Sequence, residues 1–312
     1  MNYSWKNIIL NTKGPSSTSQ CIILYLKGML MGIADLIPGV SGGTIAFITG
    51  IYEQLLEAIS SIDGTFFKCL LSFKLKEAFS RVHLKFLLVL LAGVGTSVLV
   101  FARLMHFLIY EYPIPTWGMF FGLIGASIII LGKEIESFFS VKSLFWVVLG
   151  AVLAFVIVGL IPVTTPEYFW WIFICGLIAI MAMILPGLSG SFLLLILGKY
   201  QYITGAIKNP FSSENFLILC VFAAGAITGI LGFSKVLNHF LKHFRSQTIA
   251  ILTGILIGSL RKVWPWKEVL ETVNIRGKVK VLRDQNILPT QFDLEFSLAI
   301  TLIILGFVSV LI

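Results

Sequence analysis

The chain has 312 residues, of which 57% are hydrophobic and only 12% are charged, and its mean hydropathy is +0.97. Because a soluble domain carries roughly 25% charged residues, this composition excludes an ordinary soluble domain and indicates a polytopic membrane protein. The formal net charge of +8 is typical of basic cytoplasmic loops, so we expect no nucleic-acid partner. The scattered cysteines predict neither a disulfide framework nor a metal site, and no cofactor is expected.

Apolar runs near the roughly 20 residues needed to cross a bilayer recur along the whole chain. The polar first nineteen residues lack the apolar core of a cleaved signal peptide. We expect the first repeat, residues 1–162, to hold apolar segments at 21–37, 44–59, 85–109, 116–132 and 143–162. The second repeat, residues 163–312, should hold them at 168–185, 191–207, 214–241, 247–260 and 296–312. Polar stretches at 61–84 and 261–295 separate segments within the repeats.

Each half contains a break, in which proline, glycine and serine interrupt apolar sequence. The first break, residues 35–44, reads Asp-Leu-Ile-Pro-Gly-Val-Ser-Gly-Gly-Thr. The second break, residues 183–191, reads Met-Ile-Leu-Pro-Gly-Leu-Ser-Gly-Ser and follows at an offset of 148 positions. Later matches, such as Gly93 with Gly225, continue at an offset of 132. This ordered series predicts an internal duplication.

The number of crossings in each half decides how the halves are oriented. The two segments at a break return the chain to its starting side, whether they form a re-entrant hairpin or cross fully, and three crossings follow. An odd total inserts the second half upside down. The predicted fold is an all-α polytopic membrane protein with two inverted structural repeats of about five apolar segments each and re-entrant helix hairpins broken by proline and glycine. Such paired breaks point to a transport site.

The breaks are candidate anion sites. Ser41 and Ser189 are good N-cap residues for the half-helices that follow them. The N–H groups at such a helix start carry partial positive charge and suit a phosphate. The alternative is close helix packing, which glycine and serine also favour. The residues expected to hold phosphate at the breaks are Gly39, Ser41, Gly42, Gly43, Thr44, Gly187, Ser189, Gly190 and Ser191.

Three ionisable residues inside apolar segments are also candidates, because such residues are costly in a membrane and usually functional. Asp35 has no acidic counterpart, since Met183 occupies the corresponding place. It could take up a proton during transport or simply accept hydrogen bonds from nearby backbone. Arg103 and Lys235 correspond at the second offset and could hand an anion across the membrane. Their alternative role is snorkelling to the interface.

Loop charges give a partial test of orientation. With the N-terminus inside, the connections at 61–84, 133–142 and 242–246 are cytoplasmic, and all three carry Lys or Arg. The stretch at 261–295 then lies outside, although it contains Arg261, Lys262 and Lys267, against the positive-inside rule. Either one segment is miscounted or this stretch has an outward function.

An intramembrane hydrolase is a weaker alternative. Both breaks contain Gly-x-Ser-Gly, but a nucleophilic serine needs a base within hydrogen-bond reach. The four histidines, His83, His106, His239 and His243, lie in linkers or toward segment ends. We therefore expect a transporter and not an enzyme.

The first break, Leu185-Pro186-Gly187-Leu188-Ser189-Gly190 and the stretch from Ser259 to Trp266 resemble the bacterial domain-of-unknown-function 368 family over nearly the whole chain. The resemblance implies an undecaprenyl phosphate translocase of the bacterial inner (cytoplasmic) membrane. It would return the polyprenyl phosphate carrier of wall and surface-polymer synthesis to the cytoplasmic leaflet. Arg261 then joins the expected substrate-binding residues, and the basic stretch would attract the anionic headgroup.

Other possibilities stay open beside this resemblance. The runner-up function is a secondary transporter or channel for a small soluble anion. The coupling ion is open, and a homodimer is compatible with the sequence. Because Ser191 replaces Gly43 and the second break lacks the acid, we do not expect the two breaks to bind phosphate equally.

Overall fold

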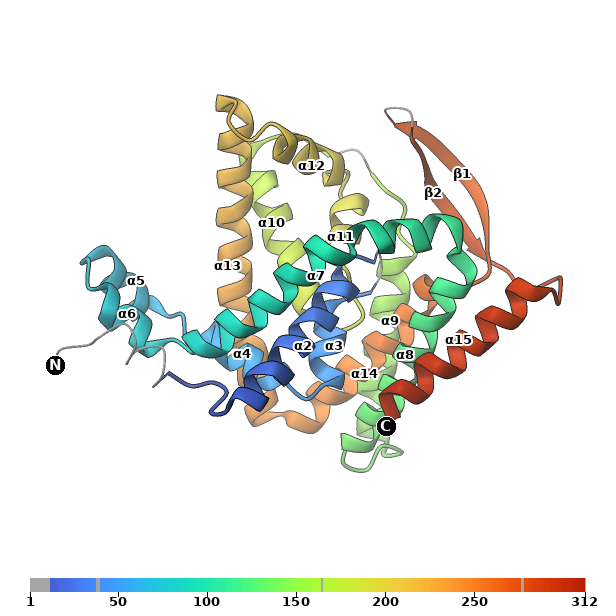
Figure 1. Cartoon of the computed structure of the whole chain (residues 1–312), viewed down its shortest axis with the longest axis horizontal. Helices are drawn as coiled ribbons and strands as arrows, with labels where there is room; N and C mark the ends of the chain where they lie inside the picture. The colour runs from blue at the N-terminus through green and yellow to red at the C-terminus, as the bar shows by residue number, and fades with distance from the viewer. Residues whose placement is uncertain (1–11, 38–39, 164, 276–277, 312) are drawn as a thin grey trace.

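The computed structural model describes residues 12–37, 40–163, 165–275 and 278–311. It is mostly helical (Figure 1), as the composition predicts. The first half contains α2 Thr18–Asp35, α3 Gly42–Ile48, α4 Tyr52–Ser60, α5 Gly64–Leu71, α6 Leu75–Arg81, α7 Leu84–Glu111, α8 Pro113–Glu134 and α9 Val141–Val158. The second half contains α10 Phe169–Ile184, α11 Gly190–Ile196, α12 Tyr200–Lys208, α13 Ser213–His243, α14 Arg245–Val263, β1 Lys267–Ile275, β2 Lys278–Asn286 and α15 Leu294–Leu311.

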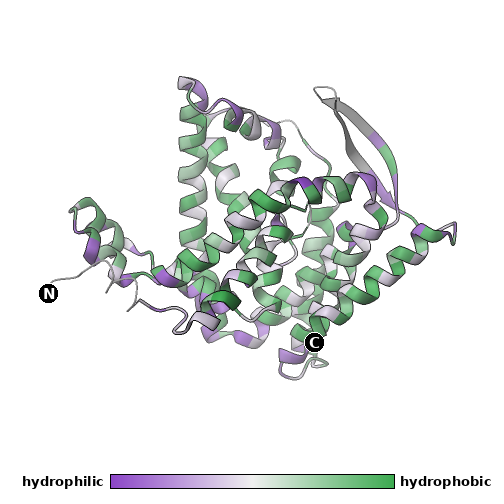
Figure 2. Cartoon of the chain, viewed as in Figure 1, coloured by the Kyte–Doolittle hydropathy of each residue, from purple (hydrophilic) through white to green (hydrophobic). Residues whose placement is uncertain are grey.

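Five helices of the described chain are long and apolar enough to cross a membrane, namely α7, α8, α9, α13 and α15. The outer face of α7 shows why these helices need lipid around them. Leu88, Leu91 and Leu99 expose 49%, 59% and 85% of their surface, and apolar residues colour most of the long helices in Figure 2. Because exposed apolar area of this kind is unfavourable in water, these faces fit a bilayer.

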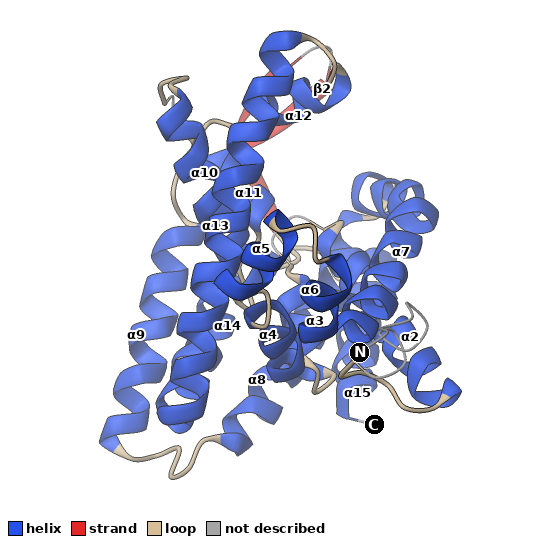
Figure 3. Cartoon of the chain, turned by 90° about the vertical axis from the view of Figure 1, so that its left-hand side faces the viewer, coloured by secondary structure: helices blue, strands red, loops and turns tan. Residues whose placement is uncertain are grey.

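Glycines bring the long helices together in corresponding pairs. At many of them, an added Cβ atom would collide with a carbonyl oxygen of the neighbouring helix, and four such contacts represent the four helix pairs. The four contacts are Gly28 with Leu90, Gly176 with Phe222, Gly122 with Ile303, and Gly254 with Val147. They pair α2 with α7 and α10 with α13, and likewise α8 with α15 and α14 with α9, which lie side by side in Figure 3. The two halves therefore use the same helix–helix contacts, and small residues allow them.

Each segment after a break is two helices and not one, which corrects the expectation for 44–59 and 191–207. Gly50 has a φ of +70° and ends α3, while Gly198, with a φ of +65°, ends α11 in the same way. Gly50 N–H donates to Phe47 O and Ile51 N–H donates to Ala46 O, at 3.0 and 2.9 Å. This pair of bonds defines a Schellman cap, which needs a left-handed residue. The chain then turns sharply into α4.

The polar stretches are structured. Residues 61–84 include α5 and α6, which bury a small cluster of Phe66, Cys69, Ala78 and Val82. Residues 261–295 include an antiparallel hairpin of β1 and β2, in which Lys267 lies opposite Asn286. The hairpin is the exception to the all-α prediction. At the start of β2, Lys278 and Lys280 alternate with Val279 and Val281, and such a period-two pattern favours a strand.

Ion pairs gather at one end of the molecule. Arg245, at the start of α14, pairs with Glu53 of α4 and, at 3.3 Å, with Glu134 of α8. Lys242 pairs with Glu57 at 3.3 Å. These contacts join connections that the loop charges assign to the cytoplasm. Figure 1 draws this end at the bottom, at the α13–α14 turn, and draws the β hairpin at the top.

Candidate functional site

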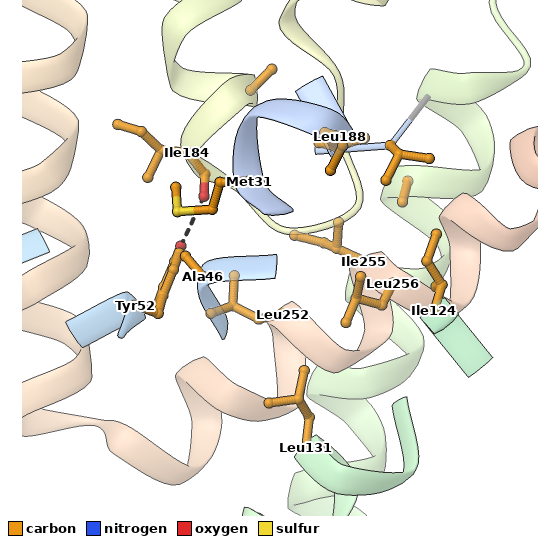
Figure 4. Packing of buried hydrophobic residues seen from close by; sticks show 14 of the residues in the cluster. Met31, Ala46, Tyr52, Ile124, Leu131, Ile184, Leu188, Leu252, Ile255 and Leu256 are labelled. Atoms are coloured by element: carbon orange, nitrogen blue, oxygen red, sulfur yellow. Dashed lines mark hydrogen bonds between the residues drawn. The ribbon is translucent and has the colours of Figure 1, made fainter. Parts of the chain in front are cut away.

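The two breaks meet inside the protein. Three hydrogen bonds link them, and each uses a side chain from the first half and a backbone group from the second. Figure 4 shows one of these bonds among the buried apolar side chains. The bonds run from Ser41 Oγ to Met183 O at 2.9 Å, from Tyr52 Oη to Ile184 O at 3.1 Å, and from Gly187 N to Thr44 Oγ1 at 2.9 Å. Ser41 of the first break and Tyr52 at the start of α4 thus satisfy carbonyl groups that the end of α10 leaves open.

The start of α3 is already paired within the chain. Ser41 is the N-cap, and its Oγ accepts from Gly43 N–H at 3.1 Å while its carbonyl accepts from Thr44 N–H at 2.9 Å. The Asp35 carboxylate accepts from Gly42 N–H at 2.7 Å. Asp35 therefore occupies the place where a phosphate was expected. A substrate anion at this helix start would have to displace that carboxylate.

The second break is built differently. Ser189 is the N-cap of α11 but makes no capping bond to the backbone, and its hydroxyl lies 2.9 Å from that of Ser191. Ser191 is exposed, whereas Ser189 is 7% exposed. Gly187 has a φ of +87°, and an added Cβ atom there would lie 2.9 Å from Ser259 Oγ in α14. The start of α11 thus packs against the last turns of α14 and presents hydroxyl groups.

The remaining predicted residues lie apart from the breaks or outside the described chain. Gly39 lies outside the described residues. Arg103 on α7 and Lys235 on α13 are exposed, and within the described chain no hydrogen bond or ion pair joins either one to a break. Asp63, just before α5, has a pKa below its ordinary value, chiefly because it accepts from Phe66 N–H, with a small contribution from Lys235. Lys235 therefore lies near the linker predicted to be cytoplasmic.

Arg261 closes the end of α14 onto α9. Its guanidinium lies 4.3 Å from the centroid of the Phe155 ring, and Nη1 donates to Phe155 O at 3.3 Å. The side chain is otherwise exposed. Arg261 thus has one face on Phe155 of α9 and the rest of its side chain exposed. It lies at the end of α14, the helix against which Gly187 of the second break packs.

The sequence analysis did not single out a cluster that we call the paired-lysine cluster, Lys262, Lys267 and Asp284. One carboxylate oxygen of Asp284 lies 3.5 Å from Lys262 Nζ and 3.4 Å from Lys267 Nζ. Lys262 Nζ is 4.9 Å from the centroid of the Phe192 ring in the first turn of α11, and Lys267 Nζ is 4.7 Å from that of Trp117 in α8. Two cations thus lie on aromatic faces and share one counter-ion, and Lys262 is the one that lies beside the second break.

Burial and mutual repulsion perturb this cluster. Burial, together with the Lys262 charge, lowers the pKa of Lys267 from 10.5 to about 8, although Asp284 partly opposes the change. Burial alone would raise the pKa of Asp284, but the two lysines together lower it. Lys262 and Lys267 were visible in the sequence as part of a basic stretch. Asp284 gave no signal, because its place depends on the register of the β hairpin.

A chain of long apolar helices with two interlocked helix breaks defines a multi-pass membrane protein with the architecture of a transporter. Residues 31–280 match the family model described as undecaprenyl phosphate translocase-like, and the chain belongs to that family. A polyprenyl-phosphate transporter of Vibrio cholerae is 42% identical over 277 residues, which cover 88% of each chain. A polyprenyl-phosphate transporter of Staphylococcus aureus is 32% identical over 259 residues, 78% of this chain and 86% of the relative. No solved structure matches the chain.

Proposed function

We propose that this protein is a polyprenyl phosphate translocase that returns undecaprenyl phosphate to the cytoplasmic leaflet of the bacterial inner membrane. The family and the two transporters that share most of its length support the substrate. The protein would hold the phosphate while the apolar tail stays in lipid. It would make and break no covalent bond.

The architecture we propose is a pair of inverted repeats with re-entrant hairpins at the breaks. The corresponding glycine contacts of the two halves support the duplication. The ion pairs at the α4 and α13–α14 end support a cytoplasmic placement of that end. Under this topology the β hairpin and the paired-lysine cluster would face outward, and the basic stretch would have an outward function.

The observation that carries the proposal is the placement of Lys262 beside the second break, together with Lys267, which shares the Asp284 carboxylate with it. Lys262 lies over Phe192, the residue that follows Ser191. A phosphate there would meet two ammonium groups and the hydroxyl groups of Ser189 and Ser191. Charge-assisted bonds of this kind are the strong ones. We propose that this outer site also uses Arg261, Gly187 and Gly190, while Gly39, Ser41, Gly42, Gly43 and Thr44 form the second half-site.

Asp35 is our candidate for proton coupling. Its carboxylate accepts a hydrogen bond from Gly42 N–H. A phosphate oxygen would accept from the same N–H if the carboxylate were absent. A proton on Asp35 would weaken this acceptor and free the amide for the substrate. Proton uptake and phosphate binding would then occur together. Arg103 and Lys235, at opposite faces under the inverted topology, would attract the headgroup on entry and exit.

The test is movement of undecaprenyl phosphate between leaflets of liposomes that contain the purified protein. The wild type should redistribute the lipid, and Lys262→Gln/Lys267→Gln should slow this about tenfold or more, because bonds to charged groups contribute about 1.5–3 kcal/mol each. Lys208→Gln, at an exposed lysine of α12, is the control. Unchanged transport at low salt after neutralising Arg261, Lys262 and Lys267 together would overturn the outer site. Flux of inorganic phosphate without lipid movement would favour a soluble-anion transporter.

A further inference from the structure

A cavity of about 530 Å³ opens at the end of the protein opposite the β hairpin. Its walls come from the segment before α2, from α2 itself, the α3–α4 turn, α4 and the start of α7, and these helices lie together in Figure 1. Its charged and polar lining includes Lys13, Lys27, Glu57, Gln20 and Gln54, and Ile23 and Phe86 give it apolar surface. This volume is in the range of small-molecule sites. No residue of the sequence-predicted site lines it.

Lys27 is the unusual member of this lining. It lies nine residues after the start of α2, about 14 Å along the helix axis, within a segment that is otherwise apolar. A lysine at such depth is costly and marks a functional site by default. Its Nζ donates to Thr49 O at 2.5 Å, and among the described residues no carboxylate pairs with it. Glu57, the acid in the lining, pairs instead with Lys13 and Lys242 at 3.1 and 3.3 Å.

The region of the second half that corresponds to the Lys27 cavity provides a comparison. At the offset of 148, Lys27 corresponds to Cys175 and Ile51 corresponds to Lys199. Lys199 is 2% exposed, its Nζ donates to Thr165 O at 2.7 Å, and Thr165 Oγ1 donates to Leu197 O at 2.6 Å. Lys27 thus binds the carbonyl end of its half-helix directly, whereas in the second half Thr165 binds that carbonyl end and Lys199 holds Thr165.

The linings of the two places differ in kind. Gln20, Ile23 and Gln54 in the first half correspond to three aromatic residues in the second. These are Tyr168, Trp171 and Tyr202, and Lys199 Nζ lies 5.4 Å from the centroid of the Tyr202 ring. The lysine of the second half is therefore enclosed, whereas Lys27 faces open volume with amide groups beside it. A role limited to capping the half-helix does not need the open volume.

We propose that the Lys27 cavity binds the phosphate headgroup of the lipid carrier at the cytoplasmic end, as a release site separate from the outer paired-lysine cluster. This inference rests on the proposed function. Lys27 supplies the charge, and Gln20 and Gln54 supply amide donors. The exposed faces of Ile22, Ile23 and Leu26, each at least 50% exposed, leave a path for the isoprenyl tail into lipid. A free phosphate ion would meet the same polar groups, but it would not use the apolar wall.

The test is photolabelling of the purified protein with a farnesyl phosphate that carries a diazirine, followed by mapping of the labelled peptides. In the wild type, peptides that contain residues 20–27 or 50–57 should be labelled. Lys27→Gln should reduce this labelling about tenfold or more, and Lys27→Arg should restore most of it. Lys199→Gln is the matched control, because it removes the corresponding lysine of the other half and should leave the cavity labelled.

A second variant guards against a folding defect in Lys27→Gln. Gln54 is exposed, and Gln54→Glu adds a negative charge to the lining while keeping Lys27 and its bond to Thr49 O. It should also lose the labelling. Equal labelling of wild type, Lys27→Gln and Gln54→Glu would overturn the release site, even if the outer cluster is labelled and the wild type transports lipid.

Three further measurements distinguish the lipid headgroup from free phosphate, and the release site from the proposed transport function. The neutral diazirine farnesol should not label the cavity. Inorganic phosphate should compete only at concentrations far above that of the lipid probe, and competition at equal concentration would assign the cavity to free phosphate and overturn the lipid headgroup. Absence of lipid transport by the wild type would refute the proposed function itself, independently of the labelling pattern.

Discussion

Replacing Asp284 with asparagine should change protein stability and phosphate binding in opposite directions. The carboxylate is the shared partner of two ammonium groups, at 3.5 Å from Lys262 Nζ and 3.4 Å from Lys267 Nζ. Breaking a buried ion pair costs about 3–5 kcal/mol. These three side chains keep 13–27% of their exposure, so solvent screening reduces the expected loss to about 2–3 kcal/mol. Thermal unfolding in detergent measures it.

The same substitution should strengthen binding of farnesyl phosphate to the outer site about tenfold, because the carboxylate no longer competes with phosphate for the lysines. Titration with farnesyl phosphate measures the affinity. The salt concentration is held fixed, because ionic screening weakens the attraction between the lysines and the phosphate. Glu268→Gln removes an exposed carboxylate from β1 and should change neither quantity. The double variant Lys262→Gln/Asp284→Asn should lose the gain in affinity. If Asp284→Asn loses stability without binding the lipid more tightly, Asp284 does not compete for the anion site and the reasoning is wrong.

Three further predictions concern stability, each measured by thermal unfolding. Gly187→Ala should cost about 1–3 kcal/mol, because a left-handed alanine is strained and its Cβ would press on Ser259 Oγ; Gly205→Ala, in open space on α12, is the control. Tyr52→Phe should cost about 1–2 kcal/mol by leaving Ile184 O unpaired, and an unchanged stability would count against the break-to-break contact. Lys267→Met should stabilise the protein at pH 7. The Lys267 ammonium loses its proton near pH 8 in the folded chain but only near pH 10.5 in the unfolded chain. The wild-type free energy of unfolding therefore rises between pH 8 and pH 10.5. Over that range the difference in stability between variant and wild type should shrink by about 3 kcal/mol.

The long helices could be predicted from the sequence because apolar length decides them. The segment expected at 85–109 is α7 Leu84–Glu111, and the one expected at 214–241 is α13 Ser213–His243. The caps after the breaks were missed, since Gly50 and Gly198 look like ordinary glycines inside an apolar run. Only the left-handed backbone at each of them shows that the helix ends there.

Contacts between helices within each half could not be predicted, because each depends on the side chains at two positions at once. Gly32 of α2 lies against Ser97 of α7, and the corresponding contact in the second half joins Ile180 to Gly229. The glycine is on the first helix of the pair in the first half and on the second helix in the second half. Gly32 therefore corresponds to Ile180 and Ser97 to Gly229, although the two helix contacts are equivalent. The Asp35 bond to Gly42 N–H was within reach of the sequence as one of two roles for that acid. The carboxylate of Asp284 was not, because it reaches the lysines only through strand pairing.

The differences between the halves matter more for transport than their likeness. Two identical inverted halves would bind the headgroup equally at the two faces, and neither face would be preferred. Under the topology that we propose, the outer end has two lysines that share one acid, whereas the inner end has an open cavity lined by Lys27 and by Lys13, which pairs with Glu57. A stronger outer site favours capture where the carrier is scarce, and a weaker inner site favours release. Affinity differences alone cannot drive net movement against a gradient, because a ligand shifts an equilibrium only by its differential affinity. Net return of the lipid therefore needs either consumption of the carrier inside or the coupling that we assign to Asp35, an acid that has no counterpart in the second break.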